Sequence, residues 1–271
     1  MPTDITSHAS LLLTLLAVGA VGGFLSGLLG VGGGIIFVPA LYFILTSFVP
    51  EAGHVMHVAI GTSTALILVT SASSAYWHNK KGAVDFAIVK SWSLSIVLGV
   101  VVGTYLASAV NGHFLKQLFS GLMLLICIYM ALSKEPSAHT ARRVSAAVQK
   151  SFAAFVGFIS ALLGVGGATL NIPFMTYMGM SMPKAVGTGS ALAVVISVPA
   201  MAGYIISGLH EPQLPPYSLG YVNWLALIVI LPVSMLLSRA GVHVSHKLSR
   251  NILRRIFAVV LAIVTIRMLT S

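Results

Sequence analysis

The chain has 271 residues, of which 57% are apolar and 7% charged, and its mean hydropathy is +0.99. A soluble surface is typically about a quarter charged or more, so this composition excludes a water-exposed globule. The 15 Lys and Arg outnumber the 5 Asp and Glu, which gives a net charge of +10. In a soluble protein this excess would suggest nucleic acid, but in a membrane protein it orients the loops. We therefore expect an all-α polytopic membrane protein with no nucleic-acid partner.

Apolar runs follow one another along the chain, and a bilayer is crossed by about 20 apolar residues. The runs are continuous rather than alternating, which excludes a barrel of strands. Two of them are interrupted, at Gly30–Gly34 and at Gly164–Gly167. Because glycine costs about 0.8–1 kcal/mol per residue relative to alanine in a helix, we expect a helix break at both places. The runs are 11–48, 55–77, 86–110, 114–132, 152–178, 185–206, 221–237 and 252–269.

The two breaks belong to an internal repeat. Gly23–Pro39 and Gly157–Pro173 are identical at ten of 17 aligned positions, and a second match follows between Ala59–Leu66 and Ala185–Leu192. Agreement of this length indicates duplication. The expected organisation is a first repeat over residues 1–133, a basic cytoplasmic linker over 134–150 and a second repeat over 151–271.

The basic residues predict a topology. If every run crossed once, the basic loops 78–90 and 134–150 would lie opposite to the basic segment 239–255, against the positive-inside bias. The conflict disappears if each broken run is a re-entrant hairpin that returns to its own side. Each half then has a hairpin plus three transmembrane helices, and because three is odd the repeats are inverted, a plan common in secondary transporters.

The same topology predicts where the joints and several basic residues lie. Arg142, Arg143 and Lys247 would share the cytoplasmic side, and both termini would be external. The joints without Lys or Arg would also be external; these are residues 50–54, 111–113 and 211–216.

A helix break within a membrane frees backbone groups, each of which costs several kcal/mol if it stays unpaired in hydrocarbon. A helix that restarts there points its free N–H groups and its positive dipole end at one spot, which favours an anion. Glycine also lets a ligand approach the backbone closely. The alternative is that the glycines only allow close helix packing. The glycines expected at the substrate site are Gly30, Gly32, Gly33, Gly34, Gly164, Gly166 and Gly167.

Neutral side chains near the repeats could complete an anion site. Hydroxyl groups hydrogen-bond an oxyanion without adding charge, and the amide of Asn171 follows the second break, where the first copy has Phe37. The alternatives are that the hydroxyls bond the backbone or a neighbouring helix, and that the amide caps or joins helices. The candidate hydroxyls are those of Thr62, Ser63, Thr188 and Ser190.

Histidine titrates near neutral pH, so His54 and His57 could couple protons to transport, or they could simply be interfacial. All five acids fall in loops or at run ends, which leaves no carboxylate relay within the membrane. No His, Cys and acid cluster has metal-ligand spacing, and Gly30–Gly34 lacks the lysine of a P-loop. We therefore expect no metal, no cofactor and no ATPase domain in the chain.

The paired motifs Gly23–Pro39 and Gly157–Pro173, together with Ala59–Ser63 and Ala185–Ser190, resemble the sulfite exporter TauE/SafE family over the whole chain. The resemblance implies a permease of the bacterial inner membrane for small sulfur-containing anions such as sulfite and organosulfonates. Gly189 stands where the family often has serine, which weighs against equal hydroxyl roles in the two halves.

These observations together predict a secondary transporter, and not an enzyme, whose partners are a small anionic substrate and the lipid bilayer. An anion channel is the first alternative because it needs the same site. An intramembrane enzyme that uses His54 or His57 is a weaker alternative, since no nucleophile accompanies these bases in the sequence.

Overall fold

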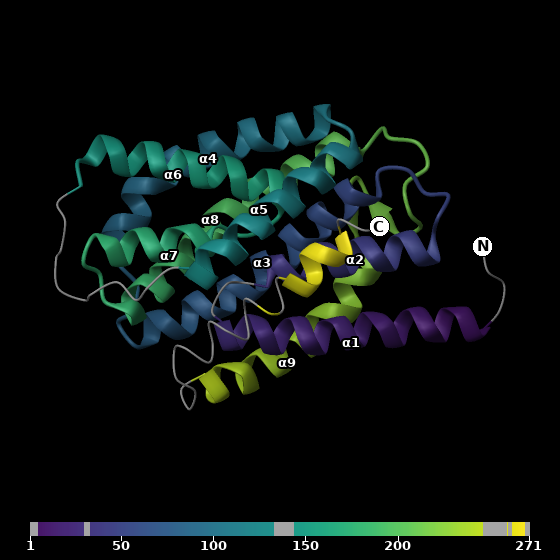
Figure 1. Ribbon diagram of the computed structural model, residues 1–271, viewed down its shortest axis with the longest axis horizontal. Coiled ribbons are helices and arrows are strands. Elements are labelled where there is room, and N and C mark those ends of the chain that lie inside the picture. The colour runs from purple at the N-terminus through teal and green to yellow at the C-terminus, as the bar shows by residue number, and fades with distance from the viewer. Residues whose placement is uncertain (1–4, 30–32, 133–143, 246–258, 260–261, 269–271) are drawn as a thin grey trace.

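The computed structural model describes residues 5–29, 33–132, 144–245, 259 and 262–268. Nearly all of these residues are helical, and the helices run roughly along the long axis of the molecule (Figure 1). One short hairpin of two strands, β1 (Ser218–Leu219) and β2 (Val222–Asn223), precedes the last labelled helix. The helices are α1 (Ile5–Leu29), α2 (Gly34–Phe48), α3 (Val55–Lys80), α4 (Phe86–Ala109), α5 (Gly112–Leu132), α6 (Ala146–Leu163), α7 (Ala168–Tyr177), α8 (Met182–Gly208) and α9 (Trp224–Ser245).

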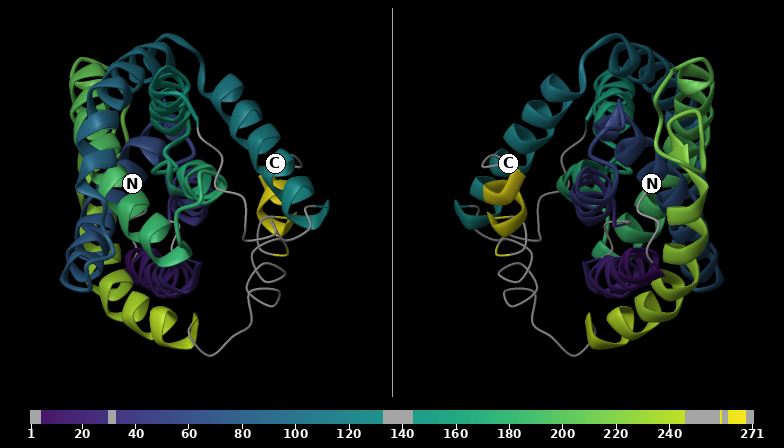
Figure 2. Two further views of the ribbon diagram at one scale, coloured as in Figure 1. Left: turned by 90° about the vertical axis from the view of Figure 1, so that its left-hand side faces the viewer. Right: turned by 90° about the vertical axis from the view of Figure 1, so that its right-hand side faces the viewer.

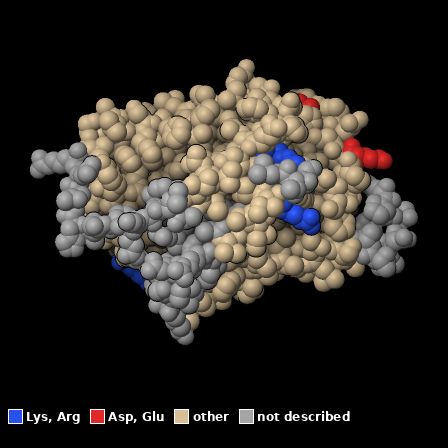
Figure 3. All heavy atoms as spheres, viewed as in Figure 1, with Lys and Arg blue, Asp and Glu red and all other residues tan. Residues whose placement is uncertain are grey.

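Within the described part of the chain, six helices are long and apolar enough to cross a membrane. Their outer faces are apolar too: on α4 the side chains of Leu94, Leu98 and Tyr105 are all exposed. Figure 3 shows one face of the molecule, on which charged side chains are few. The expected all-α polytopic membrane protein is confirmed. The six candidate spans are Ala9–Gly27, Val55–Lys80, Phe86–Ala109, Ala146–Leu163, Met182–Gly208 and Trp224–Gly241.

Helix α3 lies at the centre of this bundle. Every residue from Met56 to Ile67 is buried, and α2, α8 and α9 all pack against it. Helix α8 runs antiparallel to α3, because Gly187 near the start of α8 lies beside His78 near the end of α3, while Gly61 lies beside Tyr204. The two helices with the repeated Gly-Thr sequence therefore form the central pair.

Small residues let α1 lie directly against α9. An added Cβ on Gly19 would come within 2.9 Å of the Ile230 carbonyl oxygen, and Gly23 and Gly27 meet the backbone of Ser234 and Ser238 in the same way. A spacing of four residues puts these glycines on one face of the helix. Because the residue numbers of the contacting pairs rise in the same direction along both helices, α1 and α9 run parallel.

Helices α4 and α6 form a matching pair. Gly99 lies against the Ala154 carbonyl and Gly103 against the Phe158 carbonyl, so these two helices also run parallel. Figure 2 shows α5 and the C-terminal helical residues on the other side of the bundle from α9. Met268 packs there in one cluster with Leu115 and Phe119.

The joints without Lys or Arg meet at one end of the molecule, on the right in Figure 1. The Gly53 amide donates to the Gln213 carbonyl at 2.8 Å, which ties the α2–α3 joint to the segment before β1. The starts of α4 and α6 meet instead through Trp92, whose Nε1 donates to Gln149 Oε1 at 3.3 Å. Arg142, Arg143, Lys247 and both chain termini lie outside the described residues.

One boundary differs from the sequence prediction. The apolar run that begins at Tyr221 predicts helix from that residue, but the hairpin occupies residues 218–223 and α9 begins at Trp224. Gly220 has a φ of 54°, a left-handed value that glycine adopts without strain. The Tyr221 amide donates to the Tyr204 carbonyl at 3.1 Å, so the hairpin is held against the end of α8.

We predict that Gly27→Ala destabilises the protein by about 1–3 kcal/mol, the usual cost of overpacking, because its methyl group would overlap the Ser238 backbone. Gly121→Ala on α5 is the matched control, because an added Cβ there meets nothing within 4 Å. It should leave stability unchanged or raise it slightly, since alanine is the better helix former. Thermal unfolding in detergent micelles measures both variants, and equal midpoints would contradict the α1–α9 contact.

Candidate functional site

The second half of each broken segment restarts in the same way. Gly33 precedes α2 with a φ of 79°, and Gly167 precedes α7 with a φ of 71°. The carbonyl of each glycine accepts the first helical bond at 2.9 Å, from Phe37 and from Asn171 respectively. Residues with a Cβ rarely adopt this left-handed conformation. The repeat therefore encodes two equivalent helix starts, as the sequence predicts.

The two breaks pack against each other. Gly34 at the start of α2 lies against the Gly164 carbonyl and comes within 2.9 Å of Val165 Cα, measured from an added Cβ. The Ser63 hydroxyl of α3 donates to the same Gly164 carbonyl at 3.1 Å. Both Gly34 and Gly166 also contact Ile67, which is halfway along α3. Gly30 and Gly32 lie outside the described residues.

Asn171 is the most unusual polar side chain near the breaks. It is fully buried, one turn into α7, and neither its amide nitrogen nor its amide oxygen has a hydrogen-bond partner. A buried polar group without a partner costs about 1–3 kcal/mol, so such groups call for an explanation. The amide therefore has its donor and acceptor capacity available for a ligand.

The first half fills the equivalent place with an apolar ring. Phe37 lies so close to Gly22 that an added Cβ there would meet the ring at 2.5 Å, and the ring also covers Gly33. In the second half the aligned residues are Val156 and Asn171. Val156 is larger than the glycine it replaces, and the Asn171 side chain is smaller than the phenylalanine ring and polar. The two halves therefore differ here, although their helix breaks are alike.

The predicted hydroxyls Thr62 and Thr188 make the same contact in opposite halves. Thr62 Oγ1 accepts the Asn223 amide at 2.9 Å, and Thr188 Oγ1 accepts the Asp85 amide at 2.9 Å. Asn223 and Asp85 each cap the helix that follows, with side-chain bonds of 2.9 Å to Ala226 and 3.0 Å to Ala87. Each threonine thus holds the helix start of the other half.

The glycine before each threonine also contacts the opposite half. Gly61 packs on the Tyr221 carbonyl and Gly187 on the Ala83 carbonyl, in each case two residues before the capping residue. We call these two sets of contacts the crossed clasps: Gly61 and Thr62 with 221–223, and Gly187 and Thr188 with 83–85. The start of α9 lies near the start of α3, and the start of α4 lies near the start of α8. Because α3 and α8 are antiparallel, α9 and α4 start at opposite ends of the bundle. Their parallel partners α1 and α6 therefore run in opposite directions, as an inverted repeat requires; the inverted repeat itself stays a prediction.

The other two predicted hydroxyls are not equivalent. The Ser63 hydroxyl donates to the second break, but the aligned residue Gly189 has no side chain that could donate in the same way. Ser190 donates to the Val186 carbonyl and lies 3.0 Å from Ser74 Oγ on α3. The structure therefore brings Gly33, Gly34, Ser63, Gly164, Gly166 and Gly167 together with Asn171 one helical turn away, and it places Thr62, Thr188 and Ser190 in contacts between helices.

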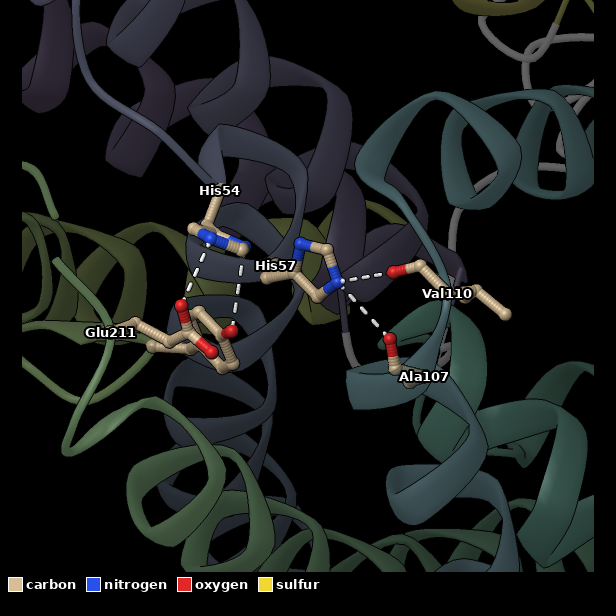
Figure 4. A network of polar contacts seen from close by, with 6 residues as sticks. His54, His57, Ala107, Val110 and Glu211 are labelled. Carbon is tan, nitrogen blue, oxygen red and sulfur yellow. Dashed lines mark hydrogen bonds and ion pairs between the residues drawn. The ribbon is translucent and has the colours of Figure 1, made fainter. Parts of the chain in front are cut away.

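His54 and His57 lie away from the breaks, in a polar cluster at the end with the joints that lack Lys and Arg (Figure 4). His54 Nε2 is 3.2 Å from a Glu211 carboxylate oxygen, and His54 Nδ1 is 3.4 Å from the Tyr221 hydroxyl. His57 is buried and stacks on the Tyr221 ring with 5.0 Å between centroids. We call His54, His57, Glu211 and Tyr221 the histidine cluster.

Nothing in the sequence indicates that Glu211 and Tyr221 lie with the two histidines. Glu211 lies in a polar joint and Tyr221 at the edge of an apolar run, both far along the chain from His54. Burial and the nearby Glu211 carboxylate raise the pKa of Tyr221 to about 12, so its phenol stays protonated at neutral pH. Only the tertiary contact between the two joints brings these groups together.

Six apolar helices, two facing helix breaks and an unpartnered buried amide define a multi-pass membrane transport protein. The family model described as "Sulfite exporter TauE/SafE" matches residues 15–268. The chain belongs to this family and is a membrane permease.

Similar proteins carry consistent names. A "Probable membrane transporter protein" of Haemophilus influenzae is 31% identical over 95% of this chain and 97% of its own length. The "Probable membrane transporter protein YunE" of Bacillus subtilis is 26% identical over 92% of this chain and 94% of its own. A relative of the same description from Methanocaldococcus jannaschii is 27% identical over 96% of each chain. No solved structure matches this chain.

We predict that Thr62→Val and Thr188→Val each destabilise the protein by about 1–3 kcal/mol, because each leaves a backbone N–H of the opposite half without its acceptor. Thr62→Ser and Thr188→Ser keep the hydroxyl and should stay close to the parent. Thermal unfolding of the purified variants compares the two clasps. A valine variant as stable as its serine control would show that the clasp contributes nothing.

Proposed function

We propose that this permease moves a small sulfur-containing anion, such as sulfite or an organosulfonate, and binds it between the two helix breaks. One observation carries the proposal: the two breaks pack against each other at mid-length of α3, and the unpartnered amide of Asn171 belongs to the first turn of the helix that restarts after the second break. The sulfur anion is suggested by the description of the family. The binding residues would be the backbone of the two glycine breaks, with Ser63 and Asn171 as neutral side chains.

The expected binding free energy of the anion suits a carrier that must release its substrate. A helix N-terminus favours an anion by roughly 0.3–1 kcal/mol when exposed and up to about 2 kcal/mol when partly buried. Hydrogen bonds to a charged group add about 1.5–3 kcal/mol each. Two helix starts, α2 and α7, and one or two such bonds give about 2–10 kcal/mol, a range that contains the roughly 4–8 kcal/mol of millimolar to micromolar dissociation constants.

The packing of the breaks favours a carrier over an open channel. Gly34 lies so close to Gly164 that an added methyl group would overlap the backbone. An anion therefore reaches this place only when the two turns separate. Binding is then coupled to a movement of one half against the other, which alternating access in inverted-repeat transporters requires.

The proposal includes the organisation that the sequence predicts. Two inverted repeats, residues 1–133 and 151–271, would be joined by the basic cytoplasmic linker 134–150 in the bacterial inner membrane. The crossed clasps support this view, because each half makes the same contact with the other. The parallel pairs α1 with α9 and α4 with α6 support it in the same way.

We predict that Asn171→Leu abolishes transport but does not destabilise the protein. The amide makes no hydrogen bond that leucine would remove, and an apolar side chain in a buried place avoids the cost of an unpartnered polar group. Uptake of labelled sulfite into proteoliposomes at matched protein density, together with thermal unfolding, separates the two effects.

Ser234→Ala is the matched control for this variant. Ser234 Oγ on α9 is also buried without a partner, but it lies at the α1–α9 contact. This variant should transport like the parent. If Asn171→Leu also transports normally, the anion does not bind beside α7.

A further inference from the structure

The histidine cluster connects two joints that belong to different halves. His54 ends the α2–α3 joint, and Glu211 lies between α8 and β1. The bond from the Gly53 amide to the Gln213 carbonyl, at 2.8 Å, runs beside the His54–Glu211 contact. His57 extends the connection to α4, because its Nε2 lies 3.1 Å from the carbonyl oxygens of Ala107 and Val110. Any opening of this end between the halves must separate these contacts.

The hydrogen-bond partners determine which ring nitrogens of His54 and His57 carry a hydrogen. Carbonyl oxygens only accept, so His57 Nε2 carries a hydrogen, and His57 Nδ1 is buried without a partner. Tyr221 is a protonated phenol at neutral pH because its pKa is about 12. When the His54 ring is neutral, the Tyr221 hydroxyl therefore donates to His54 Nδ1, and His54 Nε2–H donates to the Glu211 carboxylate.

This arrangement can take up one proton without losing a contact. If a proton from water binds His54 Nδ1, the ring becomes an imidazolium that donates from both nitrogens. Tyr221 then turns its O–H away and accepts through its oxygen, while the bond to Glu211 becomes an ion pair. The connection between the two joints is thus stronger in the protonated state. Among the described residues, the titratable groups in contact with His54 are His57, Glu211 and Tyr221, and Tyr204 lies behind Tyr221 with 6.4 Å between ring centroids.

The aligned positions at the other clasp do not repeat this cluster. In the register that aligns Gly61 with Gly187, the counterparts of His54 and His57 are Met180 and Pro183. In the register of the crossed clasps, Ala83 takes the place of Tyr221. None of these counterparts titrates. Protonation of the histidine cluster therefore has no aligned equivalent at the other clasp, where the titratable groups are His78 and Asp85.

We propose that the histidine cluster is a proton-binding latch that holds the end with the Lys- and Arg-free joints closed. Proton uptake at His54 closes the latch more firmly, and proton release favours opening. Its role in the transport cycle rests on the proposed function, but the latch itself can be tested without a substrate.

The geometry of the joint supplies a direct probe. A Cβ added to Gly53 lies 3.8 Å from Gln213 Cβ, which is about the mean Cβ–Cβ distance in disulfides. We would introduce Gly53→Cys and Gln213→Cys in a Cys127→Ser background, since Cys127 is the single native cysteine. The rate of disulfide formation is then measured at about pH 5.5 and about pH 8.5, on either side of the ordinary range of histidine. Dividing by the rate of the same pair with Glu211→Gln cancels the pH dependence of thiol chemistry.

The rate ratio of parent to Glu211→Gln should be roughly two- to five-fold higher at the acidic pH, the range expected for a partly exposed ion pair. His113→Gln, an exposed histidine at the same end, should leave the ratio unchanged. An equal ratio at both pH values would overturn the proton latch.

A transport measurement places the latch in the cycle. The oxidised Gly53→Cys/Gln213→Cys protein should lose methanesulfonate exchange in proteoliposomes, and dithiothreitol should restore it. Sulfite is not used with this protein, because it cleaves disulfides. Exchange that continues in the oxidised protein would show that this end does not open during transport. If the unaltered chain exchanges neither sulfite nor methanesulfonate, the proposed function fails, while the cross-linking result stands by itself.

Discussion

The fold depends on one constraint of the bilayer: backbone groups freed by a helix break must find partners within the protein. At the second break this constraint is met in part by Ser63, whose hydroxyl donates to the Gly164 carbonyl, and Gly34 packs on the same oxygen. These contacts involve the middle of the long, central helix α3, while α2 and α7 are short. α7 has ten residues, about 15 Å at 1.5 Å per residue.

The crossed clasps provide hydrogen-bond partners for backbone groups at two helix starts. Thr62 and Thr188 each accept a backbone N–H that precedes a helix of the opposite half. Each half therefore supplies part of the other's capping, and α1 and α6 find their main packing partners across the boundary. The histidine cluster adds an asymmetric element, because the aligned positions at the other clasp do not repeat its polar groups.

The sequence predicted the parts of this structure that follow from local chemistry. Glycine runs, repeated at a fixed offset, predicted both breaks. Contacts across the halves could not be predicted, because the backbone amides of Asn223 and Asp85 carry no sequence signal. For the same reason Thr62 and Thr188 resembled ligands for an anion, whereas both accept protein N–H groups. The β1–β2 hairpin was missed because an apolar run hides the turn at residue 220.

A site formed by two separating breaks implies that each transport step carries one bound anion. Counterflow in proteoliposomes of the unaltered chain tests this most directly. Preloading with unlabelled sulfite should accelerate the entry of labelled sulfite, entry should saturate with concentration, and methanesulfonate should compete if the site accepts sulfonates. Entry that rises in proportion to concentration and ignores the internal anion would contradict the account and indicate an open pathway.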